Sequence, residues 1–443
     1  MQPNTYLLTL SLALASPISL GQVYYLPFEL NLPSQVDPYL LGSSLSIGDG
    51  VFYVGGEGDG FDFTEGESAV YEFDSNTFQY IRTIDSPGNA FIDRFGGAVE
   101  YYDGVLLVGA INGPGTLDDI GNPIEYSGAA YLFDGFSGNL LHTFYENENI
   151  AFNSAFGRDV SINDVAIIIG APNFNGTGQV FAFNAATNNL LVTIDPPPSN
   201  TYENYGFQVD HNDDYLVVSS PGDSGFGDFG FVYVYDFTSG SLLYTLTPPN
   251  AHDAQNFGYS MDLDGSNLIV GSIRSSSVTN PIGEVHIFDL TTGLVSHTLV
   301  SDAEHNGFGL SVDLDGNIAV IGAPHDDERG ENTGAVYIYD INSQQLIDKS
   351  LPFPAPSNLQ LGREVKIDNG IILSTARDPV LGSDNRRVYY LEQFCRADIN
   401  LDGSVNFFDV SAFIKFAVDF NGDGNFNFFD VSAFLQAFQA DCP

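Results

Sequence analysis

Residues 308–340, FGLSVDLDGNIAVIGAPHDDERGENTGAVYIYD, form the unit that decides the fold, because the same pattern returns along most of the chain. The unit predicts three strands: an FG start with alternating apolar residues, the run IAVIGAP after a DG turn, and GAVYIYD after a polar loop. Short alternating or β-branched runs bounded by Gly, Asp and Asn are typical of strands and not of helices. The unit is therefore a piece of β-sheet.

The unit can be followed through its opening glycine, which recurs seven times at spacings of 49 to 61 residues: Gly42, Gly96, Gly157, Gly206, Gly258, Gly309 and Gly362. A fourth apolar segment such as LLHTF, LLVTI or LLYTL follows the third, so that one repeat supplies a four-stranded antiparallel sheet. Seven such sheets predict a mainly β fold, a seven-bladed β-propeller, in which radial packing leaves only short protected edges.

The seventh repeat lacks a fourth strand, because it stops at Phe394. Residues 23–33, VYYLPFELNLP, precede the first repeat and have the pattern of the missing strand. We therefore predict that segment 22–33 pairs beside residues 388–392 and closes the ring, and that the propeller spans residues 22–394. A loose N-terminal arm is the alternative.

The charge of the chain is strongly negative, with 57 acidic and 13 basic residues and a net charge of −44. This balance excludes a phosphate-binding surface, and therefore nucleic acid, and disfavours an anionic membrane. Cations are the expected partners, although most carboxylates of an acidic coat serve solubility alone.

The N-terminus carries an apolar segment, YLLTLSLALA at residues 6–15, that is too short to span a bilayer. Small residues follow at Ser19 and Gly21, so that residues 1–21 resemble a secretory signal peptide without the usual basic start. We expect cleavage near Gly21, with Ala15 as the alternative. No other segment is long and apolar enough to cross a membrane, and we expect a secreted or surface-attached monomer.

The long, unequal loops of the repeats are predicted to lie on one face of the propeller, because those after the second and the fourth strands emerge together. They include residues 57–67, 112–126, 196–204 and 325–332. Loops on a rigid scaffold commonly carry binding residues, and we expect a glycan or protein ligand here. The candidate residues of this face are His252 with Asp253, His305, His325, Asp326 and Asp327. No spacing brings them together, and solvated loop residues are the alternative.

Two of the innermost strands carry adjacent charges, Arg158 with Asp159 and Arg363 with Glu364. These side chains are expected either to line the axial channel and meet a ligand or to form ion pairs between blades. The sequence contains no serine nucleophile elbow, zinc motif, phosphate-binding loop or dinucleotide fingerprint, so we assign no catalytic residue.

The FG start, the GAP run and the GAVYIY strand together resemble the FG-GAP repeat family, which includes the integrin α-subunit propeller. Members of that family that bind calcium in the propeller carry a DxDxDG-type loop between strands one and two. This chain has only short turns there, such as residues 262–265 and 313–316. The positive φ angle of a two-residue DG hairpin explains these residues without a metal ion.

A second repeat, with a period of 21 residues, begins after Phe394 and contains DxNxDGxxNxxD twice. Oxygen ligands at this spacing, with Gly403 and Gly424 at the sharp turns, predict two Ca²⁺ ions. The first loop supplies Asp398, Asn400, Asp402, the carbonyl of Ser404, Asn406 and Asp409. The second supplies Asp419, Asn421, Asp423, the carbonyl of Asn425, Asn427 and Asp430.

An amphipathic helix is predicted after each loop by apolar residues at i, i+3, i+4 and i+7. The absent entering helix and the Asp at the twelfth loop position make residues 395–443 resemble a type I dockerin, a small α-helical module. The resemblance implies a cohesin-like domain or a cell-surface scaffold as partner. Two Phe pairs, Phe407 with Phe408 and Phe428 with Phe429, are expected either to contact that partner or to pack under the helices.

A disulfide between Cys395 and Cys442 is predicted, because the two residues bracket the module and an exported chain meets an oxidising compartment. The leading functional hypothesis is therefore a secreted, non-catalytic propeller that binds a ligand or surface and is tethered by the dockerin. An enzyme acting on polysaccharide, which would need two carboxylates in the axial cleft, and a structural adhesion module are the alternatives.

Overall fold

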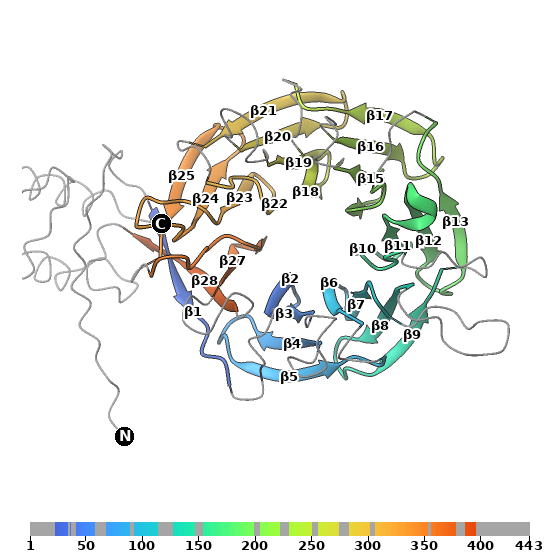
Figure 1. Ribbon diagram of the computed structural model, residues 1–443, viewed down its shortest axis with the longest axis horizontal. Coiled ribbons are helices and arrows are strands. Elements are labelled where there is room, and N and C mark those ends of the chain that lie inside the picture. Colours follow the sequence, from blue (N-terminus) through green and yellow to red (C-terminus); the bar gives the residue numbers. More distant parts are fainter. Residues whose placement is uncertain are drawn as a thin grey trace, which may run out of the picture.

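The computed structural model describes residues 23–33, 36, 41–57, 68–88, 93–113, 127–146, 154–198, 204–221, 230–249, 256–273, 283–301, 306–352, 356–377 and 386–395. These residues form seven four-stranded antiparallel sheets around a central axis (Figure 1), which confirms the predicted seven-bladed propeller. We number the sheets as blades 1 to 7 in chain order. The predicted signal peptide and, apart from the backbone of Cys395, the predicted calcium module lie outside the described residues.

Blades 1 to 6 are each built from four consecutive strands, with the first strand at the axis and the fourth at the rim (Figure 1). Blade 1 contains β2 (Leu41–Gly48), β3 (Val51–Gly56), β4 (Ala69–Asp74) and β5 (Tyr80–Asp85). Blade 2 contains β6 (Phe95–Tyr102), β7 (Val105–Ala110), β8 (Ala129–Asp134) and β9 (Leu140–Phe144). Blade 3 contains β10 (Val160–Ile162), β11 (Ala166–Ala171), β12 (Gln179–Asn184) and β13 (Leu190–Ile194), with a 3₁₀ turn at Phe174–Gly176. Blade 4 contains β14 (Val209–His211), β15 (Tyr215–Ser220), β16 (Phe231–Asp236) and β17 (Leu242–Leu246). Blade 5 contains β18 (Phe257–Asp264), β19 (Asn267–Ser272), β20 (Glu284–Asp289) and β21 (Leu294–Val300). Blade 6 contains β22 (Val312–Asp315), β23 (Ile318–Ala323), β24 (Ala335–Asp340) and β25 (Gln345–Ser350).

Blade 7 combines both ends of the propeller: β26 (Val365–Asp368), β27 (Ile371–Arg377), β28 (Arg386–Cys395) and, as its outer strand, β1 (Val23–Glu29). β1 runs antiparallel to β28 with Phe28 opposite Tyr390, so the predicted pairing is confirmed and the loose arm is wrong. β1 also binds the rim of blade 6, because the Tyr25 N–H donates to Asp348 Oδ2 at 2.6 Å and Ser350 Oγ donates to the Tyr25 carbonyl at 2.8 Å.

The hydrophobic core is divided among the interfaces between neighbouring blades rather than gathered in one place. The described residues contain seven apolar clusters, one for each pair of adjacent blades. The cluster between the last and first blades joins Leu373 and Val388 to Phe52 and Tyr71. Because this interface is packed like the other six, the ring is closed.

The glycines of the repeat follow from how closely adjacent blades approach. The opening glycine of blade 7, Gly362, has a φ angle of +92°, which side chains other than glycine rarely adopt. A Cβ atom on Gly322 of blade 6 would lie 2.1 Å from the carbonyl oxygen of Gly362. The FG glycine of one blade and the GAP glycine of the preceding blade therefore allow the two backbones to come into direct contact.

Candidate binding site in the axial channel

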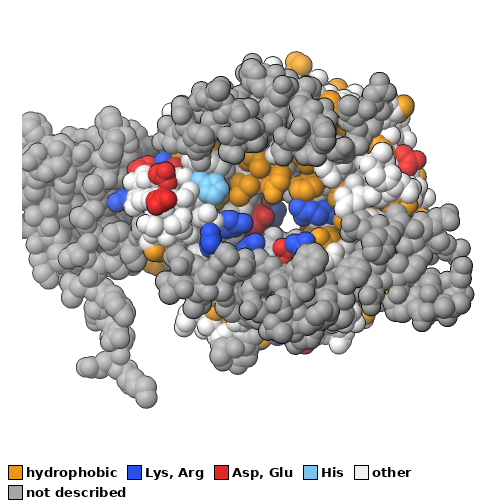
Figure 2. All heavy atoms as spheres, in the orientation of Figure 1, with side chains coloured by type: hydrophobic (Ala, Val, Ile, Leu, Met, Phe, Trp, Pro, Cys, Tyr) orange, Lys and Arg blue, Asp and Glu red, His pale blue; other side chains and the backbone are white. Residues whose placement is uncertain are grey.

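The leading segments of all seven blades line a single cavity of about 460 Å³ on the propeller axis. Figure 2 looks into this hollow and shows basic side chains around it, acidic side chains within it and apolar side chains along one edge. Five of the chain's 13 basic residues line the cavity: Arg94, Arg158, Arg363, Lys366 and Arg386. Positive charge is thus concentrated here, in a chain whose net charge is −44.

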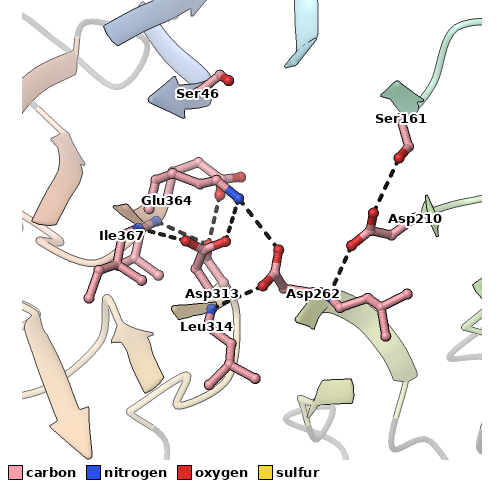
Figure 3. Close-up of polar contacts among 12 residues, drawn as sticks. Ser46, Ser161, Asp210, Asp262, Asp313, Leu314, Glu364 and Ile367 are labelled. Atoms are coloured by element: carbon pink, nitrogen blue, oxygen red, sulfur yellow. Dashed lines mark hydrogen bonds and ion pairs between the residues drawn. The ribbon is translucent and has the colours of Figure 1, made fainter. Parts of the chain in front are cut away.

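The deepest charged side chains come from one repeat position, the fourth residue after each opening glycine. We call these seven residues the inner ring: Ser46, Glu100, Ser161, Asp210, Asp262, Asp313 and Lys366. Neighbouring blades are joined through this ring, because several of its side chains accept a hydrogen bond from a backbone N–H of the next blade (Figure 3). The pairs are Ser46 with Tyr101 at 2.9 Å, Asp210 with Leu263 at 2.9 Å, Asp262 with Leu314 at 3.0 Å and Asp313 with Ile367 at 2.6 Å.

Lys366 is the one cation of the inner ring. Its Nζ atom lies 2.5 Å from Asp313 Oδ1 and 3.4 Å from Asp262 Oδ1, so it links blades 5, 6 and 7. Burial alone would lower the pKa of Lys366, but the negative charges of Asp313 and Asp262 outweigh burial and raise it well above its usual value. Lys366 is therefore charged at neutral pH.

Glu100 stands out among the inner-ring carboxylates, because it accepts no hydrogen bond within the described residues. Burial and the nearby charge of Asp210 raise its pKa well above the ordinary value. Burial also raises the pKa of Asp210 to about 7, with a further contribution from the charge of Asp262. The channel thus holds more carboxylates than its basic residues neutralise.

The mouth of the channel is formed by the residue directly after each opening glycine, and we call these seven residues the outer ring: Ser43, Gly97, Arg158, Phe207, Tyr259, Leu310 and Arg363. The ring is lopsided, since three apolar residues of blades 4 to 6 lie between two arginines, while blades 1 and 2 contribute only small residues. The Cζ atom of Arg158 lies 4.2 Å from the ring centroid of Phe207, and the rings of Phe207 and Tyr259 are 5.4 Å apart.

The mouth lies on the face predicted to carry the ligand site, because first strands begin and second strands end there. The loop of residues 325–332 emerges on this face between β23 and β24. The charged channel therefore opens on the long-loop face.

The charged pairs of the inner strands line the channel and contact neighbouring blades, but in the described residues they do so without the predicted ion pairs. Asp159 Oδ2 accepts the Val209 N–H at 2.8 Å, and Glu364 Oε2 accepts the Ser311 hydroxyl at 2.7 Å. Burial raises the pKa of Asp159 to about 6 and that of Glu364 to about 7. Within the described residues, the direct contact of each carboxylate with its neighbour is therefore a hydrogen bond from the adjacent blade and not an ion pair.

The predicted ligand-face residues of blade 6 are tied into their own blade. Asp326 is buried, accepts the Tyr337 hydroxyl at 3.0 Å and lies 2.9 Å from Lys349 Nζ. Asp327 Oδ1 accepts the Asn332 N–H at 2.6 Å, and His325 Nδ1 lies 3.2 Å from Asn332 Oδ1. These contacts shape the loop. His252, Asp253 and His305 lie outside the described residues.

Ser161, His211 and Asp210 have the composition of a catalytic triad but a different geometry. Ser161 Oγ lies 2.8 Å from His211 Nδ1 and 3.2 Å from Asp210 Oδ1, so the serine contacts both partners directly. Within the described ranges, His211 Nε2 is buried without a hydrogen-bond partner, and burial lowers the pKa of this histidine to about 4. A triad requires a carboxylate that orients the imidazole toward the serine, and no carboxylate among these residues does so.

The sequence reasoning missed the inner ring, because it assigned Asp262 and Asp313 to the DG turns. In the structure the turns are two residues later: Asp264 pairs with Asn267, and Asp315 with Ile318. Asp262 and Asp313 lie on the strands, with their side chains in the channel. Counting four residues from each opening glycine would have revealed these two residues, Asp210, Glu100 and Lys366 as one set.

In the described part of the chain, no group of three or more His, Cys, Asp or Glu side chains is arranged to hold a metal ion. The twelve predicted calcium ligands, the paired Phe residues and Cys442 all lie outside that part. Among the described residues, no helix has the length and apolar character needed to cross a membrane.

Comparison with known families supports the repeat assignment. A family model described as FG-GAP repeat matches residues 300–339, which contain most of the unit quoted at the outset. No curated protein matches the chain.

Proposed function

We propose that the propeller is a binding module whose ligand enters the axial channel from the long-loop face. The observation that carries this proposal is the convergence of seven blades on one cavity of about 460 Å³ with a charged and aromatic mouth. Ligand pockets commonly have volumes of about 300–1,000 Å³ and combine apolar walls with a few convergent polar groups. The FG-GAP match to residues 300–339 is in keeping with a binding role.

The test is to block the mouth without disturbing the blades. Ser43 lies on the open side of the outer ring and lines the cavity, so Ser43→Trp should fill the entrance. Gln345→Trp on the exposed start of β25 is the matched control. Wild type and Gln345→Trp should retain ligands found on a glycan and protein array, whereas Ser43→Trp should lose them. Equal binding by all three proteins would place the site elsewhere.

The proposed context is extracytoplasmic. Residues 1–21 direct export, residues 395–443 form a calcium-loaded dockerin, and this module tethers the propeller to a cohesin-like domain or a surface scaffold. The support is the double DxNxDGxxNxxD pattern, which matches the ligand spacing of calcium loops. In this proposal Cys395 and Cys442 are bonded, and free thiols in non-reducing mass spectrometry of the exported protein would reject the bond.

A second candidate function is hydrolysis of polysaccharide, favoured by the closeness of Asp262 and Asp313. Both contact Lys366 Nζ, at 3.4 and 2.5 Å, so their nearest oxygens are within about 6 Å of each other. Retaining glycosidases hold two carboxyl groups about 5–5.5 Å apart. However, each carboxylate here also accepts a backbone N–H of the next blade. Release of reducing ends from an oligosaccharide, abolished by Asp262→Asn, would favour the enzyme over the binding module.

A further inference from the structure

The outer ring presents two kinds of surface side by side at the channel mouth. Phe207 and Tyr259 are both partly exposed, with ring centroids 5.4 Å apart, and Leu310 continues the apolar arc. Arg158 and Arg363 stand at the two ends of this arc, in blades 3 and 7. In Figure 2 the apolar edge of the hollow is likewise flanked by basic side chains. A ligand that covers the arc therefore meets a guanidinium at either end.

The arginines retain donors for a ligand. The Arg158 guanidinium stacks on Phe207 and donates no hydrogen bond within the described residues. Arg363 donates one hydrogen bond, from Nη1 to Gln360 Oε1 at 2.9 Å. A guanidinium has five N–H donors in a planar fork that suits a carboxylate or a sulfate. Stacking on an aromatic face occupies the plane of the guanidinium but leaves its edge available.

The acidic neighbours do not neutralise these arginines through direct pairs. Asp159 and Glu364 direct oxygens at Val209 and Ser311 of adjacent blades. The charges of Arg386, Arg158 and Arg363 all act on Glu364 and oppose the effect of burial, which shows that positive groups surround it. The mouth is therefore the more basic part of the channel, and the inner ring is its acidic part.

Gln208, next to Phe207, adds a polar requirement. Its Oε1 atom is buried and has no hydrogen-bond partner among the residues that the structure describes, although Gln208 lines the cavity. A buried acceptor without a partner is unfavourable, so a ligand that brings a hydroxyl group there gains affinity. Serines line the same cavity, among them Ser43, Ser44, Ser260 and Ser311. The site thus calls for an anionic group, a flat apolar face and hydroxyl donors in one molecule.

We propose that the channel mouth binds an acidic saccharide: a sugar ring packs against the apolar arc of Phe207, Tyr259 and Leu310, Gln208 accepts a hydroxyl, and Arg158 and Arg363 hold carboxylate or sulfate groups. This inference rests on the proposed function, since it names the ligand class of the same site. The net charge of −44 disfavours long polyanions. The favoured ligand is therefore a short acidic segment or chain end that enters the cavity.

The test is calorimetric titration of the full chain with four probes: a galacturonate oligosaccharide, a sulfated galactose oligosaccharide, a neutral galactose oligosaccharide of the same length and a poly-glutamate peptide. At least one acidic sugar should bind about tenfold or more tightly than the neutral sugar, as expected for charge-assisted hydrogen bonds. The carboxylate and sulfate arms identify the anionic group. Stronger binding of poly-glutamate than of either acidic sugar would overturn the saccharide assignment.

Three variants separate charge from stacking. Arg158→Gln should reduce affinity for the acidic sugar by about tenfold and leave the neutral sugar unchanged, and Arg158→Lys should fall between Arg158→Gln and wild type. Phe207→Leu should weaken both sugars. Arg387→Gln is the control, because Arg387 pairs with Glu29 on the rim and not in the channel. Unchanged melting temperatures verify that each variant folds.

The outcomes also distinguish this inference from the binding role itself. Phe207→Leu and Ser43→Trp could weaken the binding of a ligand whose affinity is unchanged by Arg158→Gln and Arg363→Gln. In that case the channel binds the ligand, but not through recognition of an anionic group. Equal affinity for the neutral and acidic sugars would likewise overturn the inference and keep the binding module. If no sugar binds and Ser43→Trp does not change the binding of the array ligands, both proposals fail.

Discussion

Lys366 Nζ lies 2.5 Å from Asp313 Oδ1 of the preceding blade, and the backbone N–H of the next residue, Ile367, donates to Asp313 Oδ2 at 2.6 Å. Both oxygens of one carboxylate are therefore used to hold blade 7 against blade 6. Asp262 repeats half of this arrangement from blade 5, through Leu314 and Lys366. The axis of the propeller is thus fastened by polar groups, whereas the blade interfaces outside it are apolar.

Removing the lysine should expose this dependence. Lys366→Met leaves Asp262 and Asp313 close together without a cation. We expect a loss of about 1–3 kcal/mol in unfolding free energy, less than for a fully buried pair because the Lys366 side chain is 31% exposed. Asp313→Asn in the same chain should restore much of the loss, because the amide oxygen can still accept the Ile367 N–H. Thermal denaturation of the two single variants and the double variant measures the coupling. Additive effects would show that the two side chains do not interact.

Glu100 should be a position at which a substitution stabilises the protein. Its raised pKa reflects burial beside Asp210 without a hydrogen bond to offset it. Glu100→Gln removes the charge at constant shape and should increase stability by roughly 0.5–2 kcal/mol at a pH at which the carboxyl group of the wild type is ionised. Glu392→Gln on the exposed part of β28 is the control and should change little. A melting temperature lower than that of wild type would contradict the assignment.

The stability of the propeller should fall as pH rises from about 4 to about 7. Burial raises the pKa values of Glu364 and Asp210 to about 7, whereas the unfolded chain titrates near 4. Between these values the folded state retains protons that the unfolded state has lost, so stability is greatest below the unfolded pKa and is lost toward the folded one. Calorimetry at constant ionic strength measures the slope, which Glu364→Gln should flatten. A stability maximum near pH 8 would reject this account.

Deleting residues 22–33 should open the ring. Without β1, strand β28 becomes an unpaired edge and Asp348 loses the Tyr25 N–H. Unpaired edges promote aggregation, so the shortened chain should elute as large particles in size-exclusion chromatography and melt at a lower temperature. A chain beginning at residue 22 is the control. Unchanged elution and melting would mean that β1 contributes little to closure.

Chelation should separate the propeller from the proposed dockerin. A module of 49 residues buries too little apolar surface to be stable alone, so calcium should supply much of its folding free energy. Calorimetry is expected to show two transitions, with only the smaller one sensitive to EDTA. Asp409→Ala with Asp430→Ala should abolish that smaller transition and leave the larger one in place. A shift of many degrees in the larger transition would reveal calcium in the blades.

The sequence was sufficient for the architecture because each blade repeats the same local signals. Seven opening glycines predicted seven blades, and the unmatched strand before Gly42 predicted closure by β1. These features are local sequence patterns or counts of repeats, so they can be recognised without knowing the distances between residues in space.

The channel was harder to predict because its chemistry is distributed over seven repeats with one residue from each. Asp262 looked like part of a DG turn, and the lysine that it contacts is 104 residues away. Net charge was also misleading here. It predicted cationic partners for the whole chain, yet an average over 443 residues does not show that Arg158 and Arg363 converge on one opening.

The composition of blade 7 also determines the order in which the protein can be completed. Blades 1 to 6 are each made of consecutive strands, so their strands pair with segments that are close in the chain. Blade 7 differs, because Glu29 of β1 must find Arg387 of β28, 358 residues later in the chain. Contacts at such separations form late, after the entropy of closing the intervening chain has been overcome. Until β28 has been synthesised, β1 lacks the strand with which it pairs, and closure of the ring joins two segments from opposite ends of the propeller.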